Sequence, residues 1–310
     1  MNQYPKLPLA RRLKRLNFYK QMYIMLIPGL VLLFIFKYVP IYGLLIAFKE
    51  FNFRKGIIRS DWIGLKYFKQ AFSDRFFLNS VRNTFVISSF KLLIGFPIPI
   101  IIALLINEVV NPSAKKIFQT FTYFPYFISW VVLAGIFLRI FSTEGPINYL
   151  RGLFGHEPVL FFAVPRDFLM IVIGTHIWRE MGWSAVIYLA ALSNVDPQLY
   201  EAAEIDGAGR WVQTWKITIP HIMPVAVILL ILNMGFILNA GFDQVFNLYN
   251  PLVLGVGEII DTYVYKKGIV EFNYSFGAAI GFFKSIVGLV LILITNKVAI
   301  LLGGKDSGLW

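Results

Sequence analysis

The sequence predicts an all-α, polytopic membrane protein with six transmembrane helices. Of its 310 residues, 57% are hydrophobic and only 15% are charged, whereas soluble domains carry about 25% charged residues. Six apolar runs are each long enough to cross a hydrocarbon layer about 30 Å thick. Backbone groups in lipid must be satisfied within their own segment, which favours helices, and runs that are apolar all round are not typical of a β-barrel. The predicted spans are residues 22–48, 81–106, 117–141, 168–192, 219–240 and 276–302, within one domain of residues 22–303.

Positive charge before the first span sets the predicted orientation. Lys and Arg tend to stay on the cytoplasmic side, so residues 1–21 are predicted to be cytoplasmic, and six crossings return residues 304–310 to the same side. Residues 49–80 also carry many Lys and Arg, so the orientation rests on the N-terminal cluster and on the short basic loop around Lys115 and Lys116. We interpret the net charge of +12 through contact with membrane lipids rather than nucleic acid. The N-terminal cluster consists of Lys6, Arg11, Arg12, Lys14, Arg15 and Lys20.

A polar segment, residues 193–218, interrupts the apolar sequence between the fourth and fifth predicted spans and is expected on the cytoplasmic side. Asp196 can cap a helix at whose first position Pro197 is tolerated, because the N–H that proline lacks has no partner there. The run QLYEAAEID that follows is rich in helix formers, and Gly207 stands where a helix ends in a left-handed residue. This pattern predicts a sharply bounded helix that docks into a partner; the alternative is an ordinary amphipathic loop helix.

A second short helix is predicted after the glycine turn. The sequence RWVQTWKI places Trp211 and Trp215 four residues apart, and therefore on one face that suits the membrane interface. Gly209 loosens the turn before it, and Pro220 opens the fifth span at a position where proline is tolerated.

The stretch EAAEIDGAGRWVQTWKITIP resembles the EAA loop of permease subunits of binding-protein-dependent ABC importers. The pattern of that family is E-A-A, three residues, G, nine residues, then I-x-L-P. This chain departs from it only at Ile219, which replaces the leucine. The matching residues are Glu201, Ala202, Ala203, Gly207, Ile217 and Pro220.

The resemblance extends over nearly the whole chain. The stretches FKYVPIYGLLIAF, FPYFISWVV and WREMGWSAVIYLAALSNVDPQLYEAA are similar to the carbohydrate-uptake, maltose-type branch of the family. The basic N-terminus and the loop FKEFNFRKG are similar to permeases for polysaccharide or oligosaccharide uptake in Gram-positive bacteria. The resemblance therefore implies the type I importer permease fold in a bacterial cell membrane.

The resemblance also implies partner chains. The first loop helix would be a coupling helix seated in a groove of a cytoplasmic ATPase dimer, where Glu201 would pair with a basic residue. Family members of this branch usually pair two different permeases, and an extracytoplasmic solute-binding protein delivers the cargo. The chain has no G-x-x-x-x-G-K-[ST] phosphate loop, so ATP and Mg would bind the partner ATPase, and we expect neither a cofactor nor catalysis in this chain. The predicted coupling residues are Glu201, Ala202, Ala203, Asp206, Gly207, Ile217 and Pro220.

Several polar side chains are predicted at membrane depth, where ionisable groups are costly and mark a pathway or a partner by default. For Arg179 and Glu180 the alternative is an internal salt bridge, and Lys91 and Lys284 have the alternative of extending toward the headgroups. A positive cavity would fit an oligosaccharide with acidic groups, and tryptophans would stack on its sugar rings. The predicted substrate-path residues are Lys91, Trp130, His176, Trp178, Arg179, Glu180, Asn233 and Lys284.

Other functional classes receive less support from the sequence. The three histidines, His156, His176 and His221, are scattered without metal-ligand or triad spacing, which argues against a membrane enzyme or a metal site. The chain has no cysteine and hence no disulfide. A secondary transporter would show an internal repeat and coupling carboxylates at the midplane, and the sequence shows no repeat. A permease for a peptide or a lipid-linked solute remains an alternative to oligosaccharide uptake.

Overall fold

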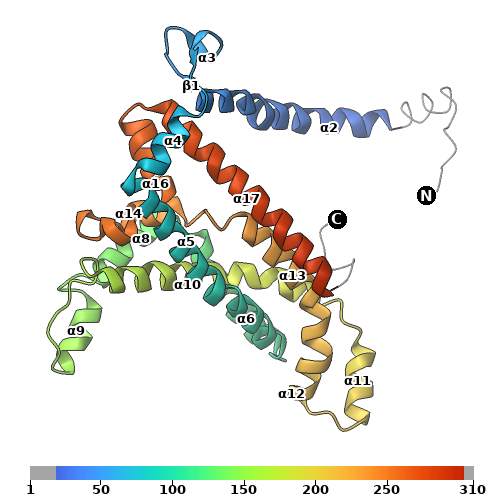
Figure 1. Cartoon of the computed structure of the whole chain (residues 1–310). Coiled ribbons are helices and arrows are strands. Elements are labelled where there is room, and N and C mark those ends of the chain that lie inside the picture. The colour runs from blue at the N-terminus through green and yellow to red at the C-terminus, as the bar shows by residue number, and fades with distance from the viewer. Residues whose placement is uncertain (1–18, 304–310) are drawn as a thin grey trace, which may run out of the picture.

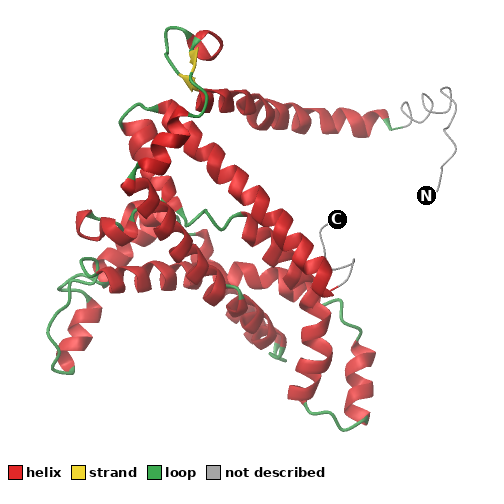
Figure 2. Ribbon diagram, in the orientation of Figure 1, coloured by secondary structure: helices red, strands yellow, loops and turns green. Residues whose placement is uncertain are grey.

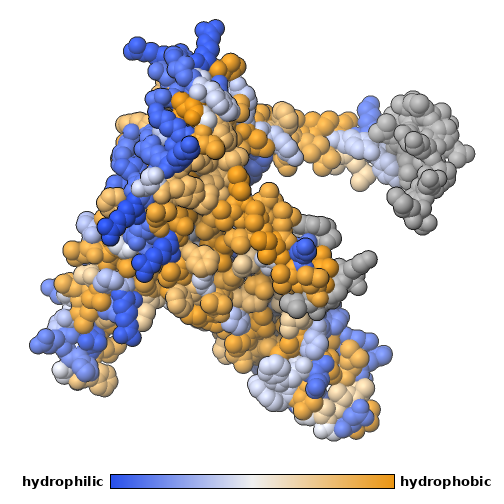
Figure 3. Space-filling model, in the orientation of Figure 1, coloured by the Kyte–Doolittle hydropathy of each residue, from blue (hydrophilic) through white to orange (hydrophobic). Residues whose placement is uncertain are grey.

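The computed structural model describes residues 19–303, which are almost entirely helical (Figures 1 and 2). The N-terminal cationic cluster apart from Lys20 lies outside the described residues, as does the predicted tail, residues 304–310. The apolar side chains gather on the long helices, whereas the top of the view, its left edge and its two lower ends are more hydrophilic (Figure 3).

The first predicted span is a continuous helical rod that stands apart from the other helices. α2 (Lys20–Leu33), which contains Pro28, runs through the π-helical turn η1 (Phe34–Tyr38) into the 3₁₀ segment η2 (Val39–Phe48). None of the most apolar stretch of this rod is buried, and α2 projects away from the molecule in Figure 1. Only η2 packs against the last helix, α17 (Tyr274–Gly303).

A small hairpin connects the first rod to the second. Its two strands pair antiparallel, and Lys55 forms an ion pair with Asp61 at 2.8 Å. The strands are the yellow elements in Figure 2 and lie where the first rod joins the rest of the chain. The elements of this connection are β1 (Lys49–Glu50), α3 (Gly56–Arg59), β2 (Asp61–Trp62) and α4 (Lys66–Ser73).

The second predicted span is one rod of 33 residues, formed by α5 (Arg75–Gly95) and α6 (Pro97–Asn107). Asp74 caps it just outside the span by accepting from the backbone N–H of Phe76, and the hydroxyl of Tyr263 donates to the same carboxylate at 2.5 Å. Burial alone would raise the pKa of Asp74, but these hydrogen bonds lower it, and the net pKa lies below its ordinary value.

The third predicted span is not one straight helix. α7 (Pro112–Tyr123) and η3 (Phe124–Phe127) meet α8 (Trp130–Ile140) at an angle of 99°. Proline at position 125 lacks an N–H for a continuing ladder, and the hydroxyl of Ser129 accepts from the N–H of Val132 to start α8 anew. The predicted run of residues 117–141 is therefore a sharply bent pair.

The fourth predicted span is α10 (Pro165–Leu192), which follows the short α9 (Pro146–Leu153). Its 28 residues correspond to a length of about 42 Å at 1.5 Å per residue. α10 packs against α5, α6, α7 and the fifth rod, so it occupies the centre of the helical assembly.

The fifth predicted span ends earlier than the sequence indicates. Its helix α13 (Ile219–Gly235) stops at Gly235, and residues 236–240, which the prediction included, lie beyond it. Gly241 has φ +90° and starts α14, a backbone conformation that glycine adopts without strain. The short elements before α17 are α14 (Phe242–Leu248), η5 (Pro251–Val253), α15 (Leu254–Gly257), α16 (Ile260–Val264) and η6 (Tyr265–Val270).

Four helical rods in the described part of the chain are long and apolar enough to cross a membrane, and a fifth is gained if the bent pair forms one span. The four rods are Lys20–Phe48, Arg75–Asn107, Arg210–Gly235 and Tyr274–Leu301. The predicted number of six is reached only by adding α10. That helix is long enough, but it carries the adjacent charges of Arg179 and Glu180 near its middle.

Glycines bring backbones close together at several places in this assembly. A Cβ added to Gly288 would lie 2.7 Å from the carbonyl oxygen of Gly235, and one added to Gly277 would lie 3.1 Å from the Cα of Gly268. Small residues allow such approaches between membrane helices. The tightest contact joins α10 to α7, where a Cβ at Gly182 would lie 2.0 Å from the carbonyl oxygen of Thr122.

We expect Gly182→Ala to destabilise the protein by about 1–3 kcal/mol, because the added methyl meets backbone rather than a movable side chain. Gly174→Ala is the matched control in the same helix, since nothing lies within 4 Å of its Cβ position. Both substitutions gain the same helix propensity. Thermal unfolding of the purified membrane complex should show a lower midpoint only for Gly182→Ala, and equal midpoints would contradict this packing.

Candidate functional site

The polar segment forms the capped helix that the sequence predicts. α11 (Pro197–Ile205) begins at Asp196, whose carboxylate accepts from the N–H of Gln198 at 2.9 Å. It ends at Gly207, which has φ +79°. The N–H of Ala208 donates to Ala203 O at 2.8 Å and that of Gly207 to Glu204 O at 3.0 Å. This pair of bonds is a Schellman motif, which closes a helix end and reverses the chain.

The second predicted helix is the beginning of the fifth rod rather than a separate element. α12 (Arg210–Gln213) and the π-helical turn η4 (Thr214–Thr218) continue directly into α13, through Ile217 and Pro220. The Trp211 and Trp215 rings lie 6.3 Å apart, as expected for residues on one face. The rod therefore connects the polar segment rigidly to the interior of the fold.

Two hydrogen bonds hold α11 against this rod. The hydroxyls of Tyr200 and Thr218 lie 3.0 Å apart, and the amide of Gln213 donates to Ala208 O at 3.1 Å. None of the α11 residues is buried, and Ile205 is 88% exposed. Glu201 and Ala202 are exposed, and Figure 1 shows α11 projecting at the end of the molecule opposite the hairpin. The arrangement leaves a rigid, uncovered helical surface.

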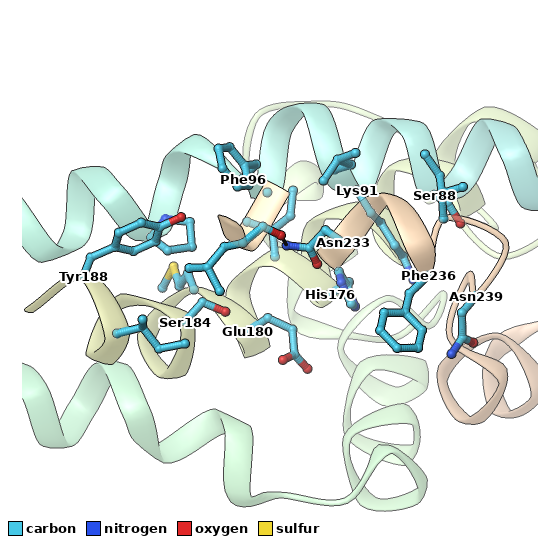
Figure 4. Close-up of a pocket in the computed structure, with 18 residues that line it drawn as sticks. Ser88, Lys91, Phe96, His176, Glu180, Ser184, Tyr188, Asn233, Phe236 and Asn239 are labelled. Atoms are coloured by element: carbon cyan, nitrogen blue, oxygen red, sulfur yellow. Dashed lines mark hydrogen bonds between the residues drawn. The ribbon is translucent and has the colours of Figure 1, made fainter. Parts of the chain in front are cut away.

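A cavity of about 400 Å³ lies between α5, α6, α10 and the C-terminal end of α13. Figure 4 shows side chains from these elements converging on it. Four of the predicted substrate-path residues line the cavity, namely Lys91, His176, Glu180 and Asn233. The other four, Trp130, Trp178, Arg179 and Lys284, do not line it. The cavity also has polar side chains that the prediction missed, namely Ser88, Ser184, Tyr188 and Asn239.

Lys91 is buried, with only 7% of its surface exposed. Its ammonium group donates to Ala240 O at 2.7 Å and to the Gln244 side-chain oxygen at 2.6 Å. The Gln244 amide in turn donates to Val172 O at 2.7 Å and to the Thr175 hydroxyl at 2.8 Å. Within the described residues Lys91 forms no ion pair, although the carboxylate of Glu180, which lines the same cavity, attracts its charge from beyond ion-pair distance.

Arg179 and Glu180 form the internal ion pair that the sequence offered as an alternative to a substrate role. The guanidinium also donates to Tyr126 O at 2.8 Å and to Ile128 O at 3.3 Å, at the bend between α7 and α8. It lies 5.1 Å from the centre of the Trp130 ring, a cation–π contact. Arg179 therefore ties α10 to the bend and neutralises the carboxylate on the cavity wall.

The remaining predicted residues have structural partners. Lys284 forms an ion pair with Asp261 at 2.5 Å, and Trp178 packs edge-to-face on Phe137 with ring centres 5.8 Å apart. Asn233 donates back to Leu229 O within its own helix at 2.9 Å. Among the described residues no cluster of His, Cys, Asp and Glu could hold a metal ion.

We expect Arg179→Ala to lower the free energy of unfolding by about 2 kcal/mol or more. It would leave Glu180 and two carbonyl groups in a partly buried site without their hydrogen-bond donor. Arg179→Lys should recover only part of this loss, since an ammonium lacks the planar fork that reaches several acceptors. Arg210→Ala is the control, because its ion pair with Glu108 at 3.6 Å is exposed and such pairs contribute little. Thermal unfolding in detergent measures all three, and a neutral Arg179→Ala would be evidence against the tie.

Residues 95–302 match the family described as binding-protein-dependent transport system inner membrane component. The chain is 44% identical to the polygalacturonan/rhamnogalacturonan transport system permease protein YteP of Bacillus subtilis (strain 168), over 90% of this chain and 88% of that protein. It is 36% identical to a chain in the crystal structure of a bacterial ABC transporter involved in the import of the acidic polysaccharide alginate. The TM-score is 0.85, with 93% of this chain and 98% of that chain covered.

A second solved structure is the alginate ABC transporter in complex with an alginate pentasaccharide-bound periplasmic protein. It is 35% identical to this chain with a TM-score of 0.85, and the likeness covers 94% of this chain and 98% of that chain. The family match spans two thirds of the residues and includes α11 and the cavity residues from Gly95 onward. The chain belongs to the family of inner membrane components of binding-protein-dependent transport systems.

Proposed function

We propose that this chain is the permease subunit of an ABC importer that carries acidic oligosaccharides. The observation that carries the cargo assignment is Lys91, a buried cation on a cavity wall without an ion pair among the described residues. An ionisable group at membrane depth is costly unless a partner or a ligand offsets its charge. The relative that transports polygalacturonan and rhamnogalacturonan and the structural neighbour that imports acidic alginate support the same chemistry.

The cavity charge differs from the one the sequence suggested. Arg179 is neutralised by Glu180, and Lys284 by Asp261. Of these three cations, only Lys91 therefore has no ion pair among the described residues. A volume of about 400 Å³ lies within the range of about 300–1,000 Å³ for small-ligand sites. The cavity would hold one segment of an oligosaccharide at a time, while the rest extends along the path.

The uncovered surface of α11 is the proposed docking site of a separate ATPase. The helix is anchored at both ends, by the Asp196 cap and the Gly207 turn, and it is bonded to the fifth rod. A displacement of α11 would thus be transmitted to α13, whose C-terminal end lines the cavity. In this proposal residues 193–218 lie on the cytoplasmic side, and both termini of the chain are proposed to lie there too. ATP and Mg would bind the ATPase.

The exposed first rod is the proposed contact with a second permease subunit of similar sequence. Its most apolar stretch has no buried residue within this chain. Lipid would satisfy an apolar helix, but the rod packs against the rest of the fold through η2, which leaves the surface of α2 free for another subunit. Two different permeases together would enclose the translocation path.

The hairpin end of the molecule is the proposed receiving surface for a solute-binding protein. It lies opposite α11 (Figure 1), and Phe53 and Trp62 are exposed there. The neighbour structure with a periplasmic protein bound supports such a partner. Cargo would enter at this end and leave near the end where the ATPase docks.

Gly207→Ala tests whether α11 is the docking helix of the ATPase. Alanine at φ +79° is strained by about 1–2 kcal/mol, which should deform the turn, weaken ATPase capture and reduce uptake several-fold. Gly209→Ala is the matched control two residues away, because its φ is −69° and nothing lies within 4 Å of its Cβ position. Co-purification of the ATPase with each variant gives the readout. Undiminished capture by Gly207→Ala, or equal loss in both variants, would count against α11 as the docking helix.

Lys91→Met tests the cargo. Removing the charge should reduce uptake of uronic-acid oligosaccharides about tenfold or more, because a hydrogen bond to a charged group contributes about 1.5–3 kcal/mol. Uptake of a neutral oligosaccharide of the same length should change much less. The assay uses the complete importer in proteoliposomes with its binding protein. Transport of peptides or lipid-linked cargo, but of no oligosaccharide, by the unaltered importer would refute the assignment.

A further inference from the structure

We propose that Ser88 and Lys91 together form a carboxylate subsite, in which the serine hydroxyl is the second donor and determines the selectivity for acidic sugars. This inference rests on the proposed transport of acidic oligosaccharides and adds the residue that reads the acid group. Ser88 lies one helical turn before Lys91 on α5, and both side chains line the same cavity (Figure 4). No hydrogen bond within the described residues involves the Ser88 side chain.

The hydroxyl oxygen of Ser88 is buried and has no hydrogen-bond partner within the described residues. The residue is only 6% exposed. Serine and threonine in a helix ordinarily donate to a carbonyl about one turn earlier. In this protein the hydroxyls of Thr84 and Thr175 donate to the carbonyl four residues earlier, and that of Ser80 to the carbonyl three residues earlier. Buried polar groups are rarely left unpaired. Because the residue lines the cavity, we assign the missing partner to a group that arrives from the cavity and that the hydroxyl reaches by rotating about the Cα–Cβ bond.

Lys91 offers the matching second contact. Two of its three ammonium protons are used by Ala240 O and by Gln244, and the third is left for the cavity. Those two bonds fix the position of the charge. Residues three apart on a helix face the same side, with Cβ atoms about 5–6 Å apart. A carboxylate has two oxygens, so one can accept from the ammonium and the other from the hydroxyl.

The rest of the cavity suits the neutral part of a sugar. His176 and Tyr188 line it, and neither makes a hydrogen bond within the described residues. Both can exchange hydrogen bonds with sugar hydroxyls. Glu180, the one carboxylate on this wall, is bonded to Arg179 and forms no ion pair with Lys91. The acid group of the cargo is thereby directed to the Ser88 side of the cavity.

The test compares Ser88→Ala with Ser88→Thr in the complete importer, supplied with saturating loaded binding protein so that delivery does not limit the rate. Oligogalacturonate and its fully methyl-esterified form, which lacks the charge at equal length, serve as cargo. Ser88→Ala should lower the ratio of acidic to esterified transport rates about tenfold. Ser88→Thr keeps the hydroxyl and should retain most of the ratio. Ser285→Ala, on an exposed face of α17, should change neither rate.

The outcomes separate the two proposals. If the unaltered importer does not carry oligogalacturonate, the proposed cargo is wrong and the subsite falls with it. If it does, and Ser88→Ala leaves the ratio unchanged, the hydroxyl is hydrated only and the subsite alone is refuted. If Ser88→Ala fails to assemble, Ser88→Cys decides, because the thiol has a similar size but is a weak donor. A lowered ratio with Ser88→Cys supports the subsite, and an unchanged ratio overturns it.

Discussion

One buried ammonium group connects the chain beyond the end of the fifth rod to two other helices. Lys91 on α5 bonds Ala240 O and Gln244, and Gln244 bonds α10 through Val172 O and Thr175. The chain between α13 and α14 has left the helical ladder, so its carbonyl groups need partners that lipid cannot supply. The lysine supplies the partner of Ala240 O and at the same time places a cationic residue on the cavity wall. The break, the cavity and its electrostatic character therefore share one cause.

Rigid connections extend from this centre to both ends of the molecule. The fifth rod runs without interruption from the turn beside α11 to Gly235, where backbone contact with Gly288 fixes it against α17. At the opposite end, the hydroxyl of Tyr263 reaches the carboxylate that caps α5. Short polar contacts at the rod ends and close glycine contacts between the rods leave few places where the helices can move independently.

The sequence was informative where a feature depends on neighbouring residues. The Asp196 cap, Pro197 and the left-handed Gly207 act within one or two turns, so the pattern predicted α11 with its bounds. The sequence did not predict the 99° bend after Phe127. The run remains apolar through the bend, and hydropathy carries no information about the direction of a helix axis. Which residues line the cavity depends on contacts between helices that are far apart in the sequence. Lys91 and Arg179 therefore looked alike as intramembrane cations, although only one has a carboxylate partner. Ser88 was overlooked, yet its spacing of three residues from Lys91 was a readable signal.

The solitary first rod has a consequence for biogenesis. α2 precedes every other described helix in the chain, and it is the one that the finished fold covers least. During synthesis it can enter the bilayer and remain there surrounded by lipid, without waiting for the later helices that form the interior. Because lipid tails and a neighbouring subunit are similarly apolar surroundings, exchanging one for the other carries a small penalty. In the proposed assembly of two permeases, each subunit would therefore be inserted separately and find its companion afterwards by diffusion in the plane of the membrane.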